Sequence, residues 1–473
     1  MKKTSPQRTL TGTQVSLVGL GGAIGATLFV GSGVVVANTG PAAMISYLIG
    51  GLTIIVAMRM LGEMATVEPA RGSFATYAAQ AIGPWAGFTL GWLYWAVWVT
   101  VIAYEISLSG FMLHDAFPAV PIWVGGTLMF VSLLIANLYS LRNFATVESV
   151  LSILKVVAVV AFAIVGILLI SGVIEPVDDR DIGWSMVQGH GGLFPLGIGV
   201  VFTSVVLVAF SMSGTEIAAI AASESDDPAR NVARAIRQTV FRVILFFAVS
   251  VAVIVLVIPW TETGDLANPF ARVFGIAGLP AAETAMTVVV FIAIASIMNS
   301  GIYTSSRMLE ALAAKGDAPR VLAKRSQRGI PKYATCIVAA FAYALALLNM
   351  SSLSTLFTFL ANCTGGVIVL VYIFLGVSHI RLRRLRGDAN LTLKVWLFPG
   401  LSYFFVAASC VMYVSQLFIT GLRTQFLCTT GFLAVVLIGY WTKARWFPSK
   451  ATTVQAMPAA AISVPTQSPD FAE

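Results

Sequence analysis

The chain has 473 residues, of which 58% are hydrophobic and only 11% are charged, and its mean hydropathy is +0.88. Since a soluble domain usually carries about 25% charged residues, this composition excludes an ordinary soluble protein and indicates a polytopic membrane protein. The net charge of +8 invites a nucleic-acid partner. We expect none, because the placement of the basic residues along the chain explains the charge as a topology signal.

Twelve apolar segments are each near or above the roughly 20 residues that a membrane-spanning helix needs. They cover residues 14–37, 41–66, 85–113, 121–140, 147–172, 195–222, 236–259, 282–312, 333–350, 353–378, 395–419 and 425–443. If the segment 1–13 is cytoplasmic, we place Arg180, Arg272 and Arg423 outside, Lys155 within a span, and every other Lys and Arg on the inner side, in a loop or toward the inner end of a span. This bias places both termini in the cytoplasm. The tail 447–473, rich in Ala, Pro, Ser and Thr, is expected to be disordered.

Stretches rich in small residues interrupt the first and the sixth apolar segments, at Gly21–Gly33 and Ala209–Ala222. A broken helix persists in a membrane only where protein buries the break or where it lines a cavity. Five spans follow from each broken start, and a five-span unit inverts when it is repeated. We therefore predict an all-α transporter core over 14–378, built of inverted repeats 14–172 and 195–378, with two additional helices over 395–443.

The break in the first span is expected to supply backbone groups to a substrate. A new half-helix would begin near Ala26 and Thr27, whose N–H groups favour a carboxylate. The preceding half-helix would end near Ala23 and Ile24, whose carbonyls accept from an ammonium group. The predicted binding residues of this span are Ala23, Gly25, Ala26 and Thr27. Close helix packing is the alternative role for glycines in a membrane helix.

The break in the sixth span repeats this arrangement with the opposite topology. Carbonyls near Phe210 and Ser211 would be freed, and N–H groups would resume near Gly214. The predicted binding residues here are Phe210, Ser211, Ser213 and Gly214. Opposed donors and acceptors suit a zwitterion, so the expected small-molecule partner is an amino acid. Phe210 is also a candidate aromatic gate, although an aromatic residue in a span more often serves packing.

Ionisable residues within spans are candidates for function. Lys155 lies about eight residues from the inner end of its span, roughly 12 Å deep at 1.5 Å per residue. We expect it to couple a proton or to replace a bound cation, with snorkelling to the surface as the alternative. Glu105 is a candidate for a proton or the substrate amine, or for a place at the outer interface. Glu216 is a candidate for capping the broken helix or for coupling, and Asn299 for lining the path or bonding between helices.

The cysteines lie in apolar runs and the histidines are scattered in loops or at span ends, and neither a metal-ligand pattern nor a nucleophile–base pair is visible in the sequence. We therefore expect no metal, no cofactor and no enzyme activity. A membrane sensor would need a sizeable soluble output domain, whereas the long loops of this chain read as basic connectors.

Several motifs resemble those of the amino acid–polyamine–organocation (APC) superfamily, and within it the bacterial amino acid permeases. They are GAIGATLFVGSG in the first span, MRMLGEMATVEPARGSFATYA from Met58 to Ala78, VESVLSILKV in the fifth span, AFSMSGTEIAAIAASESDDP from Ala209 to Pro228, and NSGIYTSSRMLEALAAKGDAP from Asn299 to Pro319. The resemblance implies the LeuT-like five-plus-five inverted repeat with two extra helices. It also implies proton-coupled amino acid uptake across the cytoplasmic membrane.

The resemblance places individual residues on family positions. Lys155 falls on the lysine of the fifth span, Phe210 on the aromatic gate, Glu216 on the glutamate of the sixth span and Glu105 on a glutamate of the third. The run Ala23-Ile24-Gly25-Ala26-Thr27 departs from the Thr-Ile-Gly-Thr-Gly typical of lysine and aromatic permeases. It is closer to the gamma-aminobutyrate permeases, so the expected substrate is gamma-aminobutyrate or another omega-amino acid. The alternatives are symport of another neutral or aromatic amino acid, and amino acid exchange on the same fold.

Overall fold

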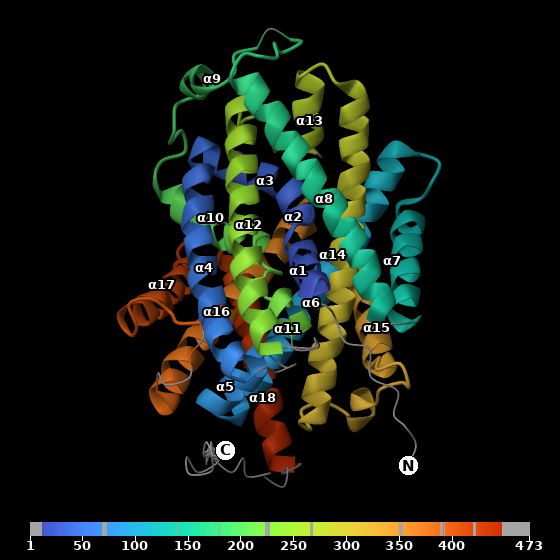
Figure 1. Ribbon diagram of the computed structural model, residues 1–473, viewed down its shortest axis with the longest axis vertical. Helices are drawn as coiled ribbons and strands as arrows, with labels where there is room; N and C mark the ends of the chain where they lie inside the picture. Colours follow the sequence, from blue (N-terminus) through green and yellow to red (C-terminus); the bar gives the residue numbers. More distant parts are fainter. Residues whose placement is uncertain are drawn as a thin grey trace, which may run out of the picture.

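Helices form all the regular structure in the part of the chain that the computed structural model describes. The described residues are 12–68, 73–139, 141–178, 180–222, 228–264, 268–349, 353–387, 391, 393–419 and 422–446. Most of the long helices run roughly along the long axis of the molecule (Figure 1). This architecture satisfies the backbone hydrogen bonds of each segment within itself, as a hydrocarbon surrounding requires.

In chain order the α-helices are α1 (Gly12–Ala23), α2 (Ala26–Phe29), α3 (Gly31–Thr39), α4 (Ala43–Val67), α5 (Ser73–Ala81), α6 (Pro84–Ala116), α7 (Ile122–Tyr139), α8 (Leu141–Ile170), α9 (Trp184–Gly189), α10 (Gly199–Ser211), α11 (Ile217–Ala222), α12 (Pro228–Val257), α13 (Pro269–Ile276), α14 (Pro280–Ala314), α15 (Lys332–Asn349), α16 (Leu353–Arg386), α17 (Gly400–Ser415) and α18 (Arg423–Trp446). Short 3-10 turns occur at η1 (Gly40–Ala42) and η2 (Arg320–Ala323).

Seven helical segments of the described chain are long and apolar enough to cross a membrane. They are Thr27–Val67, Pro84–Ala116, Ile122–Tyr139, Glu148–Ile170, Pro280–Ala314, Cys363–Arg386 and Arg423–Arg445. Shorter apolar helices lie at Gly199–Ala209, Ile244–Val257, Lys332–Leu347 and Gly400–Ser415. Each of these segments overlaps with a span predicted from the sequence, which confirms the all-helical class and its long apolar elements.

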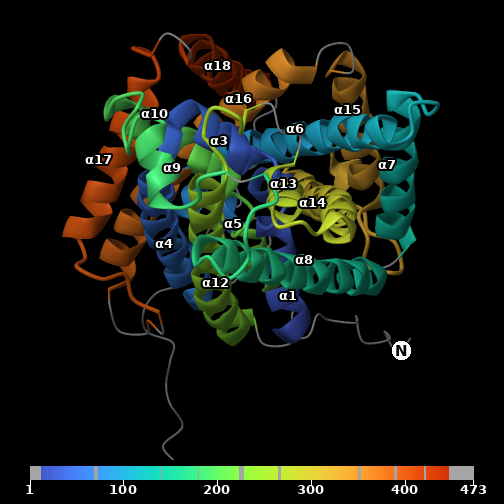
Figure 2. The same cartoon turned by 90° about the horizontal axis from the view of Figure 1, so that it is seen from above.

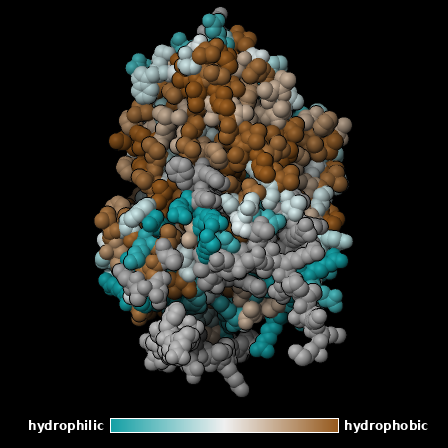
Figure 3. Space-filling view, in the orientation of Figure 1, coloured by the Kyte–Doolittle hydropathy of each residue, from teal (hydrophilic) through white to brown (hydrophobic). Residues whose placement is uncertain are grey.

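The outer surface of the helices is apolar, as lipid contact requires. On α8, Ile153, Val157, Ile164 and Ile167 are each more than half exposed. Apolar side chains cover much of the upper part of the face in Figure 3, and polar ones gather toward its lower end. Exposed apolar surface on this scale is unusual for a soluble monomer, so it supports the interpretation of the composition.

The connections between the long helices contain three short helices, α5, α9 and α13, that the sequence analysis does not predict. The start of α13 has a local cause. The Asn268 side chain accepts a hydrogen bond from the Ala271 N–H at 3.1 Å, and Pro269 occupies the first turn. Asn before Pro is a recognised helix start, so this helix is readable from the sequence.

The two broken helices lie inside the bundle. α1 and α2 climb through the molecule toward α3, whereas α10 descends toward α11 (Figure 1). α14 lies between α6 and α8 when the molecule is viewed from above (Figure 2) and packs against both. α1 contacts α8, α11, α12 and α14. The first break thus lies next to α8, which carries Lys155, and α14, which carries Asn299.

Candidate functional site

The first break falls where the sequence predicts it. α1 ends at Ala23, α2 begins at Ala26, and only Ile24 and Gly25 separate them. A Cβ atom on Gly25 would overlap with the side chain of Ile297 on α14. No larger residue fits there, so Gly25 permits close packing of α14 against the break.

Lys155 of α8 holds the end of α1. Its Nζ donates to the Gly21 carbonyl at 2.6 Å, to the Ile24 carbonyl at 2.7 Å and to Ser296 Oγ of α14 at 2.7 Å. The side chain is fully buried, so it does not snorkel to the surface. An ammonium group has three N–H donors and no acceptor, and here each donor has a partner. Lys155 therefore brings a cationic group to the carbonyls of the broken helix.

This arrangement changes one expectation about the backbone. The sequence analysis assigns the Ile24 carbonyl to a substrate ammonium, but Lys155 already occupies it. The Leu28 N–H at the start of the second half-helix also has a partner within the chain, because it donates to the Gly25 carbonyl at 3.0 Å. Lys155 reaches the Gly21 and Ile24 carbonyls because α1 and α8 pack side by side, which the sequence of either span alone does not reveal. The N–H groups of Ala26 and Thr27 and the Ala23 carbonyl remain the backbone candidates of this break.

Glu148 is a buried member of the site that sequence reasoning missed. It is fully buried on α8, about two helical turns before Lys155, on the same face. Ser296 Oγ donates a short hydrogen bond to Glu148 Oε1 and accepts one from Lys155. Asn299 Nδ2 donates to Glu148 Oε2 at 3.1 Å, and Asn137 Nδ2 of α7 donates to Asn299 Oδ1 at 2.7 Å. We call Glu148, Lys155, Ser296, Asn299 and Asn137 the lysine–carboxylate cluster.

The contacts of Asn299 lie within this cluster. Its amide bonds to Glu148 and Asn137, so it joins α14 to α8 and α7. Of the two roles predicted for Asn299, the structure contains the bond between helices. Because its partner belongs to the lysine–carboxylate cluster, Asn299 also lies in contact with the candidate coupling groups.

The second break is built around Glu216. α10 ends at Ser211 and α11 begins at Ile217. Gly214 has φ of +100°, a conformation that favours glycine. Glu216 Oε2 accepts from the Gly214 N–H at 2.9 Å, and Oε1 accepts from the Tyr94 hydroxyl of α6 at 3.1 Å. The buried carboxylate therefore caps the break, as one of the two predicted roles requires, and ties it to α6.

The two breaks touch each other. Thr27 Oγ1 donates to the Ser211 carbonyl at 3.0 Å, and a Cβ on Gly22 would lie 3.3 Å from the Gly214 carbonyl. Predicted residues of the first and sixth apolar segments thus lie in contact, with Ser213 half-buried at the second break. The side chains of Ala23, Ala26 and Phe210 lie outside the described part of the structure. The role of Phe210 as a gate stays a prediction.

Glu105 of α6 is fully buried, and neither carboxylate oxygen has a hydrogen-bond partner among the described residues. It interacts electrostatically with Lys155, as Glu148 does. An ionised carboxylate without hydrogen bonds is costly in an apolar interior. Glu105 is therefore an interior group next to the cluster rather than a residue of the outer interface.

A second buried charge network ties α4 to α16. Glu63 Oε2 of α4 accepts from Arg383 Nη1 at 3.0 Å and from the Val395 N–H at 2.7 Å, while His379 Nε2 lies 3.0 Å from Glu63 Oε1. The network shares no residue with the lysine–carboxylate cluster or with the breaks. Because it fixes α16 and the segment before α17 to α4, we assign it a structural function.

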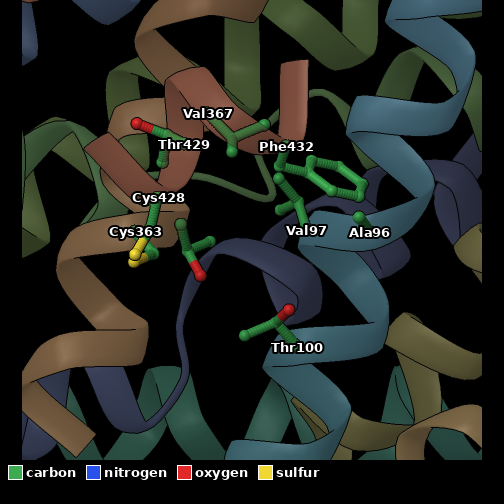
Figure 4. Close-up of a pocket in the computed structure, with 9 residues that line it drawn as sticks. Ala96, Val97, Thr100, Cys363, Val367, Cys428, Thr429 and Phe432 are labelled. Carbon is green, nitrogen blue, oxygen red and sulfur yellow. The ribbon is translucent and has the colours of Figure 1, made fainter. Parts of the chain in front are cut away.

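A cavity of about 180 Å³ lies between α6, α16 and α18 (Figure 4). Its lining residues are Ala96, Val97, Thr100, Cys363, Thr364, Val367, Cys428, Thr429 and Phe432. None of these residues is charged, so the cavity offers no counter-charge to a zwitterion and is not the predicted site. In the described part of the chain, no group of three or more His, Cys, Asp or Glu is placed to hold a metal ion.

Comparison of the chain with known proteins identifies its family. Residues 14–453 match the amino acid permease family. The gamma-aminobutyric acid permease of Bacillus subtilis is 42% identical over 429 residues, which cover 90% of this chain and 91% of the relative. The gamma-aminobutyric acid permease of Escherichia coli is 36% identical, covering 92% and 94%. A probable GABA permease of Pseudomonas aeruginosa is 37% identical, covering 89% and 90%.

Proposed function

Because the chain belongs to the amino acid permease family, and so is a multi-pass membrane transport protein rather than an enzyme, we propose that it takes up gamma-aminobutyrate or a related omega-amino acid together with protons. The match to this family is the observation that supports transport of an amino acid. The three relatives described above, each named for gamma-aminobutyrate, support the choice of substrate, as does the Ala23–Thr27 run of the first span.

The substrate would bind where the two breaks meet. Its carboxylate would face the N–H groups of Ala26 and Thr27, and its amine the carbonyls at the end of α10. The bond from Thr27 Oγ1 to the Ser211 carbonyl supports this place, because it brings groups of both repeats to one point. Inverted-repeat transporters bind their substrates at such interfaces.

Proton coupling would act through Lys155. This fully buried lysine donates to two carbonyls at the end of α1, so its charge state bears directly on the geometry of the break. Two carboxylates, Glu148 and Glu105, interact with it electrostatically. Buried ionisable groups of this kind mark proton paths in membrane proteins.

The topology follows from the charge distribution. We propose twelve spans, with both termini in the cytoplasm, the five-plus-five inverted repeat over 14–172 and 195–378, and the extra pair over 395–443. The basic cluster around η2 and the arginines that end α16 support this orientation, because cytoplasmic segments carry an excess of Lys and Arg. In a bacterium, the site of action would be the cytoplasmic membrane.

Uptake of labelled gamma-aminobutyrate into proteoliposomes tests the proposal. An imposed inward proton gradient should drive uptake, omega-amino acids should compete best, and a proton ionophore should abolish accumulation. Gradient-driven uptake of a different amino acid would keep the mechanism and refute the substrate. Uptake only into vesicles preloaded with amino acid would identify an exchanger instead.

The variant Ala26→Thr tests the place of the site. A larger side chain at the start of α2 should crowd the carboxylate and shift the order of the competing amino acids. An unchanged order, with the protein folded and transporting, would contradict binding at this break.

A further inference from the structure

We propose that Glu148 exchanges a proton with Lys155 through the hydroxyl of Ser296, so that the lysine–carboxylate cluster, and not the lysine alone, is the protonation switch of the transporter. This inference rests on the proton coupling proposed above. It adds a specific partner and a route for the proton.

The geometry provides a continuous hydrogen-bonded path. Lys155 Nζ donates to Ser296 Oγ at 2.7 Å, and Ser296 Oγ donates in turn to Glu148 Oε1. Both charged groups are fully buried. A hydroxyl carries one donor and two acceptor sites, so Ser296 is able to accept from the ammonium and donate to the carboxylate at the same time.

The transfer is balanced within three residues. A proton leaves Lys155 Nζ and binds Ser296 Oγ, while the original hydroxyl proton of Ser296 binds Glu148 Oε1. One N–H bond and one O–H bond break, and two O–H bonds form. Lys155 becomes a neutral amine, Ser296 remains a neutral hydroxyl, and Glu148 becomes a carboxylic acid, so no electrons are exchanged and the net charge of the three residues is unchanged.

A buried site favours such a transfer over the loss of a single charge. An unpaired charge in a low-dielectric interior is far more costly than an ion pair or two neutral groups. Asn299 donates to the other oxygen of Glu148 at 3.1 Å, and Asn137 holds Asn299 at 2.7 Å. These amides keep the carboxylate facing Ser296 in one orientation.

The position of the proton controls the end of α1. A neutral amine retains two N–H donors and gains a lone pair, so it no longer donates to three acceptors. Two of those acceptors are the Gly21 and Ile24 carbonyls at the break. Gly21 also lies directly against the carboxylate, since a Cβ there would overlap with Glu148 Oε1. Proton transfer would therefore weaken the hold of α8 on the broken helix.

The other groups that face Lys155 fit this assignment. From α1 it meets backbone carbonyls, and from α14 the Ser296 hydroxyl. From α6 the charged group that interacts with it is Glu105, which has no hydrogen bond to any described residue. Glu148 is thus the carboxylate that a hydrogen-bonded path connects to the lysine.

The test compares accumulation with exchange in proteoliposomes. With one proton per substrate, an inward gradient of one pH unit supports about tenfold accumulation of labelled gamma-aminobutyrate. Glu148→Gln keeps the shape of the side chain but accepts no proton. We expect its accumulation ratio to fall to about one, while exchange across preloaded vesicles continues and loses its dependence on pH.

Two substitutions of Ser296 test the relay separately from the carboxylate. Ser296→Ala removes the hydroxyl and should lower the accumulation ratio as Glu148→Gln does, whereas Ser296→Thr keeps a hydroxyl and should retain it. Glu283→Gln, in the first turn of α14 and far from the cluster, is the matched control and should behave as the unmodified protein. All variants are compared after size-exclusion chromatography confirms equal monodisperse yield.

The outcomes separate the two proposals. If the unmodified protein transports without a proton gradient, the coupling itself fails, and the relay fails with it. If the unmodified protein is proton-driven but folded Glu148→Gln or Ser296→Ala still accumulates tenfold with an unchanged pH profile, only the relay is overturned. If accumulation and exchange are lost together in folded Glu148→Gln, Glu148 is structural and the relay is likewise overturned.

Discussion

Replacement of Lys155 by methionine is the most informative perturbation of the site. Lys155→Met keeps a long unbranched side chain but removes the ammonium group. The Gly21 and Ile24 carbonyls lose their donor, and the fully buried Glu148 loses its cation. The protein then contains an uncompensated buried charge.

The effect of Lys155→Met on the free energy of unfolding follows from these contacts. Removing one partner of a buried ion pair typically costs about 3–5 kcal/mol, because the other charge is left buried. Each hydrogen bond to a charged group is worth about 1.5–3 kcal/mol, but losses within one network are not additive. We therefore expect Lys155→Met to lower the free energy of unfolding by about 3–5 kcal/mol and to abolish accumulation.

A second substitution removes the uncompensated charge of Glu148 that causes this loss of stability. In Lys155→Met/Glu148→Gln the carboxylate is replaced by a neutral amide, so the double variant should recover about 2 kcal/mol relative to Lys155→Met alone. Lys315→Met is the matched control, because Lys315 lies at the end of α14 and donates to Thr76 on the surface. Its effect should stay within about 0.5 kcal/mol.

Thermal stability in detergent measures these differences. The fraction of monodisperse protein that survives heating gives an apparent melting temperature for each variant, which is suitable where unfolding is irreversible. We expect the order unmodified protein, Lys315→Met, double variant and Lys155→Met, from most to least stable. A double variant that is less stable than Lys155→Met would refute the pairing of Lys155 with Glu148.

Two further substitution pairs test the breaks. Gly21→Ala places a methyl group against the buried Glu148 carboxylate and should destabilise the protein by about 1–3 kcal/mol. Gly431→Ala, on the open face of α18, is the control and should be neutral or slightly stabilising. Equal melting temperatures for the two variants would contradict the close contact between Gly21 and Glu148. Glu216→Gln should reduce the initial rate of uptake at least about tenfold, because it weakens the cap of the second break, and Tyr94→Phe should have a smaller effect, worth about 1 kcal/mol. A larger effect for Tyr94→Phe than for Glu216→Gln would show that the tyrosine acts independently of the cap.

The sequence predicts the position of both breaks closely, because clustered glycine and serine residues weaken a helix within an otherwise apolar run. The first break is expected near Ala23–Ala26 and occupies Ile24 and Gly25. The burial of Lys155 is also readable from its depth in the span. What the sequence of one span does not contain is its register against a neighbour, and this register decides that Lys155 binds the Ile24 carbonyl.

Glu148 was missed for a related reason. The predicted fifth span begins at residue 147, so a glutamate there resembles a polar residue at a membrane boundary. α8 begins earlier, at Leu141, and this places Glu148 about two turns inside the helix. Hydropathy marks where apolar residues begin, not where a helix begins, and a buried carboxylate near that border is easily misread. A search for ionisable residues on the helix face of Lys155 would have found it.

Substrate-induced movement of protons tests the proposed coupling of the amino acid to protons. Proteoliposomes containing the protein and an internal pH-sensitive dye receive external gamma-aminobutyrate without any imposed gradient. We expect the interior to become more acidic only when the amino acid is added, and we expect no such change with Lys155→Met. Uptake of labelled gamma-aminobutyrate with no change in internal pH would contradict this coupling.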